Sequence, residues 1–282
     1  MGQVRNSTDL AGGSVQPISR SNDCGTRVFT PKEAAQQEEQ FRTLAQSKGV
    51  TSQVRLLRSQ PFVVPLYYHV VYESETFAGG YLTDTQIHAA VSLLNEGFST
   101  SGMEFRLDGI QRHHNPTWFR LSEPNSDGWP HEWQMKTQTK IGGMDTLNVW
   151  TNGMNLAAGY ARYPWDNLNG AVDGVVMKYD VIPGNGNQIR SGKSLTHEVG
   201  HWAGLYHTFD GGCTGNGDFV ADTAAQGTAT DFNGCHPRDT CPGQPGEDPV
   251  ENFMDYSSDQ CRNHFTWGQI DRMWTTFSTY RV

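Results

Sequence analysis

Three histidines at fixed spacings constrain this 282-residue chain more than any other feature. His197 and His201 stand four residues apart in the segment SLTHEVGHWAGLYH, so on a helix they share one face. Two imidazole nitrogens that converge from one face can bind Zn²⁺. Glu198 follows the first histidine and is offset around the helix, where it can reach a water at the metal and serve as a general base. The sequence therefore predicts a helix that carries a zinc site.

The residues after this pair extend it to a three-ligand pattern. Gly204 comes three residues after His201, where the chain has to leave the helix, and glycine readily takes the left-handed conformation of such a turn. The turn lets His207 come back as a third ligand. Three protein ligands leave one position for water, which is typical of a catalytic rather than a structural zinc. A chance string of these residues at these offsets is the weaker interpretation.

A methionine further along fits the same site. Met254 lies in the segment NFMDY, and a methionine in an apolar context usually fills a core. Behind an HExxHxxGxxH motif it is instead interpreted as the Met-turn beneath the zinc.

Hydrophobic periodicity predicts mixed α/β structure around the motif helix. Strands are predicted at residues 62–72, 103–107, 147–150 and 175–177. Helices are predicted at residues 31–48, at residues 83–98 with a Thr83–Gln86 capping box, and after a second capping box formed by Thr266 and Gln269. The order strand–helix–strand–strand–strand indicates an α/β layer ahead of the motif helix.

The cysteines indicate an oxidising compartment. Four of the five, Cys213, Cys235, Cys241 and Cys261, lie in the last quarter of the chain, and this crowding in a loop-rich stretch predicts two disulfides. Four cysteines allow three pairings, and spacing does not choose among them. A second metal site is the weaker interpretation because the sequence has no CxxC pair.

Composition limits the classes of binding partner and the cellular location that we expect for the protein. A formal net charge of −9 argues against nucleic acid as the main partner, which would need clustered Lys and Arg. The sequence contains no run of 18 apolar residues, so it predicts no membrane span. Residues 1–23 show no apolar h-region of a signal peptide, yet the disulfides still favour a secreted, extracellular protein.

The segments HEVGHWAGLYHTF, VADTAAQ, NFMDYSSDQC and HFTWGQ resemble the pappalysin branch of the metzincins, especially its secreted microbial members. The resemblance covers roughly residues 60–282 and is most specific over residues 194–268. It implies a zincin-like α/β (α+β) fold. A mixed twisted sheet and the active-site helix would lie above a cleft, and a disulfide-braced C-terminal subdomain with the Met-turn and the C-terminal helix would lie below it.

The resemblance also implies roles for single residues. The zinc ligands would be His197, His201 and His207, with Glu198 as general base. Tyr256 would help to stabilise the tetrahedral intermediate, and Met254 would form the Met-turn. The disulfides would join Cys213 to Cys241 and Cys235 to Cys261. Structural calcium would bind in the loop after the third histidine, where the nearest matches are Asp218, Val220, Asp222 and Thr223. A solvated acidic loop would give the same pattern.

Cys24 stands alone near the start of the chain, in the segment NDCGT. It is either a free thiol or an intermolecular disulfide, or it is a latency switch whose thiolate takes the open zinc position. Pappalysin-like zymogens carry a similar Cys-Gly element, which favours the switch. Residues 1–58 are then a pro-segment, with cleavage near Arg55–Ser59, and residues 59–282 the catalytic domain, divided into an upper part (59–204) and a lower part (205–282).

Together these features predict a secreted zinc endopeptidase made as a latent zymogen. Its substrates would be proteins or peptides bound in extended conformation, with Gly159–Arg162 resembling the strand that borders the substrate. It would act as a monomer. The alternatives are a zinc hydrolase that acts on non-peptide bonds and a proteolytically silent zinc-binding module. The loop 257–260 lies near the place where some family members carry an acid that selects arginine, and the sequence leaves this preference open.

Overall fold

A five-stranded mixed sheet forms the centre of the fold in the computed structural model, which describes residues 24–50, 62–166, 170–186, 190–231 and 234–282. The strand order is β2-β1-β3-β5-β4, in which β1 pairs in parallel with β2 and β3, and β3 with β5. Only β4 runs antiparallel, and it forms one edge of the sheet. The strands are β1 (Phe62–Tyr72), β2 (Met103–His114), β3 (Leu147–Asn152), β4 (Gly159–Ala161) and β5 (Val175–Lys178).

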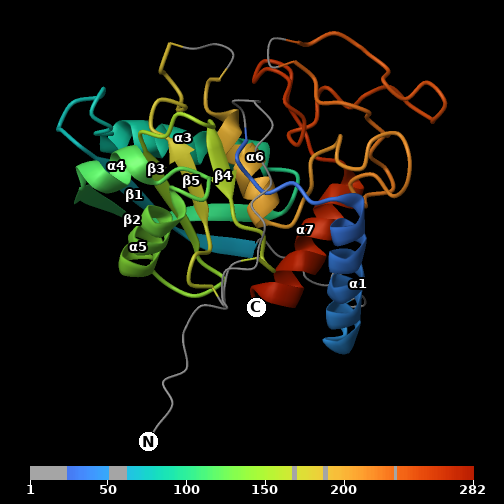
Figure 1. Cartoon of the computed structure of the whole chain (residues 1–282), viewed down its shortest axis with the longest axis horizontal. Helices are drawn as coiled ribbons and strands as arrows, with labels where there is room; N and C mark the ends of the chain where they lie inside the picture. The colour runs from blue at the N-terminus through green and yellow to red at the C-terminus, as the bar shows by residue number, and fades with distance from the viewer. Residues whose placement is uncertain (1–23, 51–61, 167–169, 187–189, 232–233) are drawn as a thin grey trace, which may run out of the picture.

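Two hydrophobic cores lie on opposite faces of this sheet because successive side chains of a strand point to opposite sides. Val149 and Val175 join the larger core, which includes residues of α3 (Asp84–Gly97) and α6 (Lys193–Trp202). Their neighbours Trp150 and Val176 join the smaller core, with residues of α4 (Pro116–Leu121) and α5 (Trp129–Thr139). Helix α6 is therefore packed against the sheet beside β4 (Figure 1).

The predicted strands and helices are confirmed, with two differences. Both predicted capping boxes form, at Thr83 and at Thr266. Strand β2 continues to His114, well beyond the alternating apolar residues, because β1 pairs with it along its whole length. Helices α4 and α5 were not predicted, since their few apolar residues form no long stripe that period analysis can detect.

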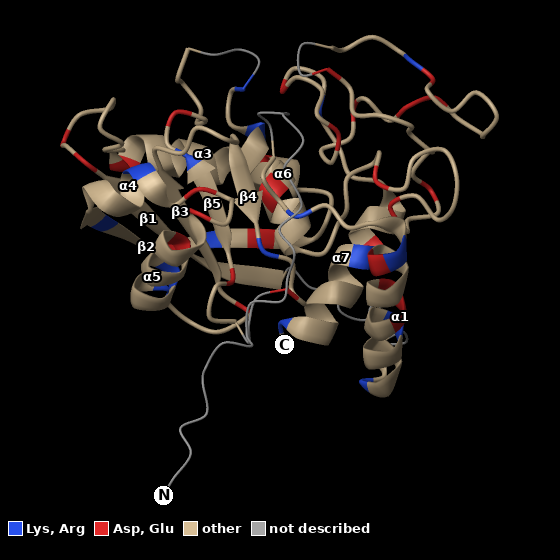
Figure 2. Cartoon of the chain, in the orientation of Figure 1, with Lys and Arg blue, Asp and Glu red and all other residues tan. Residues whose placement is uncertain are grey.

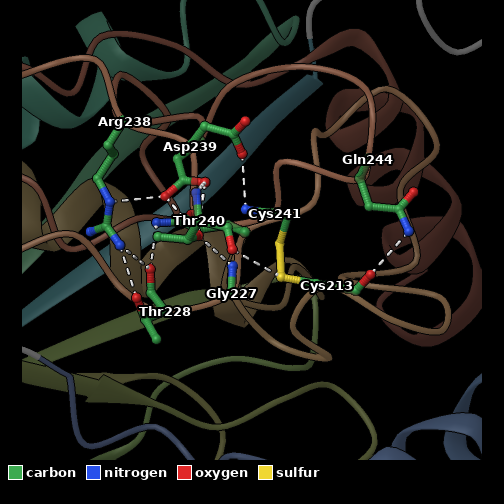
Figure 3. The surroundings of a disulfide bond; sticks show 10 residues. Cys213, Gly227, Thr228, Arg238, Asp239, Thr240, Cys241 and Gln244 are labelled. Atoms are coloured by element: carbon green, nitrogen blue, oxygen red, sulfur yellow. Dashed lines mark hydrogen bonds and ion pairs between the residues drawn. A yellow bond between two sulfur atoms is a disulfide. The ribbon is translucent and has the colours of Figure 1, made fainter.

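The segment between α6 and α7 (Trp267–Tyr280) contains no helix or strand among its described residues and is braced by disulfides. Cys213 is joined to Cys241 and Cys235 to Cys261, which is the pairing that the resemblance implies. Around the first disulfide, the amide of Gly227 donates to the Thr240 hydroxyl at 2.7 Å (Figure 3). Arg238 pairs with Asp248 at 2.9 Å (Nε to Oδ2). The disulfides and polar contacts hold this loop-rich part in place.

Helix α7 closes the fold against the end of α6, and α1 (Pro31–Ser47) runs beside α7 (Figure 1). Arg281, just after α7, donates to the carbonyl of Trp202 at 2.6 Å and pairs with the buried carboxylate of Asp173 at 3.0 Å. Acidic and basic residues are otherwise interspersed along the described chain (Figure 2). Within the described ranges, every helix is too short or too polar to cross a membrane.

Candidate metal centre

Helix α6 brings the first two histidines of the motif together. His197 and His201 lie one turn apart on α6, and their Nε2 atoms are 3.1 Å apart. Both side chains are buried, with exposed fractions of 2% and 0%. The helix places both rings where a single ion could contact them.

The chain leaves α6 through a left-handed turn at Gly204, whose φ is +97°. The amide of Leu205 donates to the carbonyl of Gly200 at 2.9 Å across this turn. A Cβ at position 204 would lie 2.6 Å from the side chain of Thr276 on α7, so both the backbone and the packing require glycine. The turn returns the chain so that the Nε2 of His207 lies 3.1 Å from that of His201.

The other nitrogen of each ring has a fixed partner. The Nδ1 of His197 donates to the carbonyl of Phe253 at 2.7 Å, and that of His201 donates to the carbonyl of Leu205 at 2.7 Å. The Nδ1 of His207 lies 3.2 Å from the carboxylate of Asp210. These bonds place the ring proton on Nδ1 and leave the Nε2 lone pairs directed at one another.

Burial keeps the rings of His197 and His201 neutral. Desolvation, followed by the neighbouring histidines, lowers the pKa of His197 and of His201 well below the ordinary value. Neutral imidazoles are the form that binds a metal. Two nitrogens bound to zinc at about 2.0–2.1 Å in a tetrahedron lie about 3.3 Å apart, which is close to the separation of these lone pairs. The three rings therefore fit a zinc ion.

The Met-turn lies directly under α6. A Cβ on Gly200 would lie 2.4 Å from the Sδ of Met254, so a glycine in this helix allows the methionine its close approach. Asn252 holds the turn: its side-chain oxygen accepts from the amide of Met254 at 2.9 Å, and its amide group donates to Gln269 of α7 at 2.8 Å. Met254 therefore packs against the helix that carries His197 and His201.

Glu198 and Tyr256 flank the histidines from two sides. Glu198 is fully buried on α6, and its Oε2 accepts a hydrogen bond from the hydroxyl of Thr26 at 2.9 Å. The hydroxyl of Tyr256 lies 3.1 Å from the Nε2 of His207. The structure thus places both residues beside the point where the three Nε2 atoms meet.

The segment around Cys24 fills the same point from the N-terminal side. The Cys24 thiol donates to Glu198 at 3.4 Å, and its sulfur and the three ring nitrogens all lie within 4.8 Å of one another. Cys24 pairs in parallel with Gly159 of β4, and the amide of Ala161 donates to Thr26 at 2.8 Å. Burial, and then the charge of Glu198, raise the pKa of the Cys24 thiol well above its ordinary value. A thiolate here requires a neighbouring cation.

Among the four residues matched to a calcium site, the carboxylates of Asp218 and Asp222 have different surroundings. Asp218 is buried, and desolvation raises its pKa to about 7. The Thr223 side chain opposes this rise through a hydrogen bond to the Asp218 carboxylate. The amide of Val220 donates to an Asp218 carboxylate oxygen at 3.0 Å. The carboxylate of Asp222 is occupied, because it accepts from the Thr266 hydroxyl at 2.7 Å and from the Gly268 amide at 2.8 Å at the start of α7.

The acid in the loop after Tyr256 is already neutralised. Arg262 donates to one carboxylate oxygen of Asp259, and the amide of Lys193 donates to the other at 2.9 Å. Asp259 and Arg262 are both buried. The Asp259 carboxylate is therefore committed to Arg262 and to the start of α6.

Sequence reasoning missed three residues that contact the site. Asp210 orients His207, Thr26 bonds to Glu198, and the hydroxyl of Tyr163 lies 3.3 Å from the Nδ1 of His201. Asp210 stands three residues after His207, and an acid so close to a predicted ligand is a local signal that could have identified it. Nothing in the sequence indicates that Tyr163 reaches His201, since the two come from separate segments.

Comparison with known proteins agrees with this geometry. Residues 129–278 match the model of peptidase family M43, described as pregnancy-associated plasma protein-A. An extracellular metalloprotease of Sordaria macrospora is 39% identical over 279 residues, which cover 96% of this chain and 91% of that protein. One from Colletotrichum graminicola is 41% identical over 234 residues, covering 80% of each chain.

Solved structures show the same fold. A complex of mirolysin with a small compound has 28% sequence identity and a TM-score of 0.67, covering 79% of this chain and 94% of that one. A promirolysin mutant from Tannerella forsythia has 26% identity and a TM-score of 0.67, covering 91% of this chain and 94% of that one. The pro-form thus matches more of this chain than the first structure does.

Fold and site together define a metalloendopeptidase of the metzincin type, with a catalytic metal and peptide substrates. The chain belongs to the pappalysin family, peptidase M43, whose members are zinc metalloendopeptidases. It is an extracellular enzyme made as a zymogen.

Proposed function

We propose that His197, His201 and His207 hold the catalytic zinc of this enzyme and that the described chain is its latent form. The observation that carries the proposal is the convergence of three Nε2 atoms, with separations of 3.1 Å on either side of His201. Zinc bound there supplies a Lewis acid that polarises the scissile carbonyl and lowers the pKa of the attacking water. All three ligands come from one chain, which supports a monomeric enzyme.

The protein's own groups then carry the proton and the charge. Glu198 takes a proton from the attacking water and delivers it to the leaving amine. The Tyr256 hydroxyl donates a hydrogen bond to the oxygen that becomes negative during attack. The edge strand β4, which Cys24 covers at Gly159 in this form, offers backbone groups with which an extended peptide substrate can pair once the N-terminal segment has left.

The same geometry explains latency. The Cys24 sulfur occupies the position beside the three histidines that the attacking water needs, and the Thr26 hydroxyl donates a hydrogen bond to the Glu198 carboxylate. The segment pairs with β4, the strand that the substrate would use. We assign residues 1–58 to the pro-segment and 59–282 to the catalytic domain, divided at 204/205. The proposed cleavage site near Arg55–Ser59 lies outside the described residues.

A calcium ion is proposed in the loop after the third histidine. Asp218, the carbonyl of Val220 and the hydroxyl of Thr223 are the supporting residues, because a buried carboxylate whose charge is penalised by desolvation is stabilised by a bound cation. Calcium chelation should lower the melting temperature of the parent chain, whereas Asp218→Asn should remove this sensitivity. Equal chelator sensitivity in both proteins would exclude this site.

Replacement of Glu198 tests the catalytic assignment. The activated Glu198→Gln enzyme should keep one zinc per chain and lose roughly 10³-fold or more of its peptidase activity, because a positioned general base contributes about 10²–10⁴-fold. The two measurements are zinc content by mass spectrometry and cleavage of a peptide library. Substantial turnover by the zinc-loaded variant would show that another group moves the proton.

A further inference from the structure

Helix α1 lies away from the histidines yet contributes to the main hydrophobic core. Phe41 and Ala45 on α1, and Val50 just after it, are almost fully buried. The ring of Phe41 stacks on that of Tyr280 at the end of α7, with centroids 6.0 Å apart. The ammonium of Lys48 donates to the carbonyl of Thr279 at 2.7 Å. The pro-segment is therefore held at a second place as well as at Cys24.

A buried ion pair dominates this second contact. Glu38 on α1 and Arg272 on α7 form a two-pronged pair, in which one prong measures 3.0 Å (Nη1 to Oε2). Both side chains are buried, with exposed fractions of 4% and 8%. The two elements that carry the pair, α1 and α7, lie side by side (Figure 2). A planar guanidinium bound by both carboxylate oxygens gives a directional contact that a lysine could not reproduce.

Arg272 also contacts the turn that carries the third histidine. Its Nε donates to the carbonyl of Gly204 at 2.8 Å, and its guanidinium lies 4.9 Å from the ring centre of Tyr206 and 5.4 Å from that of Phe41. Glu38 thus neutralises a cation that supports the backbone between His201 and His207.

A second arginine makes the dependence on Glu38 clear. Arg281 donates to the carbonyl of Trp202, and its carboxylate partner Asp173 belongs to the region that we assign to the catalytic domain. Arg272 donates to the carbonyl of Gly204, just after the end of α6, but its carboxylate partner Glu38 belongs to the pro-segment. Only one of these two arginines keeps its carboxylate partner when the pro-segment leaves.

We propose that Arg272, Thr279, Tyr280 and Tyr206 form a docking surface that retains α1 after the pro-segment has been cut. The ligand is an amphipathic helix with a carboxylate and, three residues later, an aromatic ring, as at Glu38 and Phe41. The cut pro-segment then stays bound as a separate inhibitory chain, and its release is a second step of activation. This inference rests on the proposed division of the chain near residue 58.

The physical reason is that the contacts described for α1 stay in place when the chain is cut within residues 51–61. The helix keeps its apolar side chains in the core and its carboxylate on Arg272, while Cys24 remains at the histidines. Two attachment points on one segment raise its effective affinity, because release of one end leaves the other bound. Loss of the segment would also leave Arg272 without its carboxylate partner.

The test uses the full chain with a site-specific protease sequence placed within residues 51–61. Cys24→Ala is included in every protein, so that retention depends on α1 and not on the metal. After cutting, the fragment should co-elute with the catalytic domain in size-exclusion chromatography. Adding Glu38→Gln should raise the dissociation constant of the fragment at least about tenfold, because a buried pair has lost one charge. Glu39→Gln, the same change at the adjacent exposed residue, should leave it unchanged.

The outcomes separate the two proposals. If the cut fragment dissociates at once, or if Glu38→Gln and Glu39→Gln behave alike, the docking surface is refuted even when the enzyme is active. In the opposite case, the cut fragment stays bound, and the zinc-loaded protein cleaves no peptide even after the fragment has been stripped from it. The docking surface then stands and the catalytic proposal fails. Should Glu38→Gln not fold, a synthetic peptide of residues 24–50 with or without that change provides the same comparison by competition for the catalytic domain.

Discussion

At the scale of single residues, the site depends on groups that fix the histidine protons. Each Nδ1 has an acceptor, and two of the three acceptors are backbone carbonyls that no substitution can remove. Asp210 is the exception, because it contacts His207 through its side chain. It accepts from the backbone amide of His207 at 3.0 Å as well, so it holds both the ring and the turn.

Asp210→Ala should weaken zinc binding about 10–100-fold, since outer-shell partners of metal-bound histidines contribute on that scale. The matched change Asp210→Asn keeps a hydrogen-bond acceptor and should weaken zinc binding less. The measurement is competition with a chelator of known zinc affinity, followed by a metal-content assay. Unchanged affinity in the alanine variant would mean that the Asp210 contact does not orient the ligand.

At the scale of elements, α6 is positioned by what packs above and below it. The sheet and α3 contact one side of the helix, and the Met-turn lies against Gly200. Arginines from α7 and its end bind the carbonyls at the end of α6. Positive charge near a helix C-terminus is favourable because it offsets the helix dipole. The helix is thus held by packing along its length and by charge at its end.

Gly200→Ala should lower the free energy of unfolding by about 1–3 kcal/mol, because the new methyl overpacks against the sulfur of Met254. Met254→Ala alone should also destabilise the protein by leaving a cavity. Combined, the two changes should cost less than the sum of their separate costs, because the small side chain makes room for the methyl. Strictly additive costs in denaturant unfolding would show that these two residues do not touch.

At the scale of the whole molecule, the sequence predicted what depends on local pattern and missed what depends on distant contacts. The metal motif, Met254 and the capped helices follow spacings within a few residues, and the structure has them in those places. Arg272 and Glu38 are 234 positions apart, so no local pattern could pair them. Asp259 shows the same limit, because its carboxylate could face a substrate only if Arg262 did not already bind it.

A buried histidine far from the metal makes stability depend on pH. Desolvation lowers the pKa of His69 to about 4, although its bond to Asn148 opposes this shift. The unfolded histidine takes up a proton first, near pH 6.5, so the stabilisation is full above that pH and is lost as the pH falls toward 4. The loss should approach about 3 kcal/mol, at about 1.4 kcal/mol per pKa unit.

His69→Gln should therefore reduce the loss of unfolding free energy between pH 7 and pH 4.5, while the same change at the exposed His88 should not. Denaturant titrations at each pH give the comparison directly. A pH dependence that is the same in both variants would contradict the assignment of this effect to His69.

The central claim is that three imidazoles and, in the latent chain, one thiolate share a single zinc. X-ray absorption at the zinc edge measures this directly in the zinc-loaded protein. The uncut chain should show three nitrogen ligands at about 2.0 Å and one sulfur at about 2.3 Å, and the sulfur should disappear once the pro-segment is removed. A metal surrounded only by oxygen, or with fewer than three histidine ligands, would contradict this assignment.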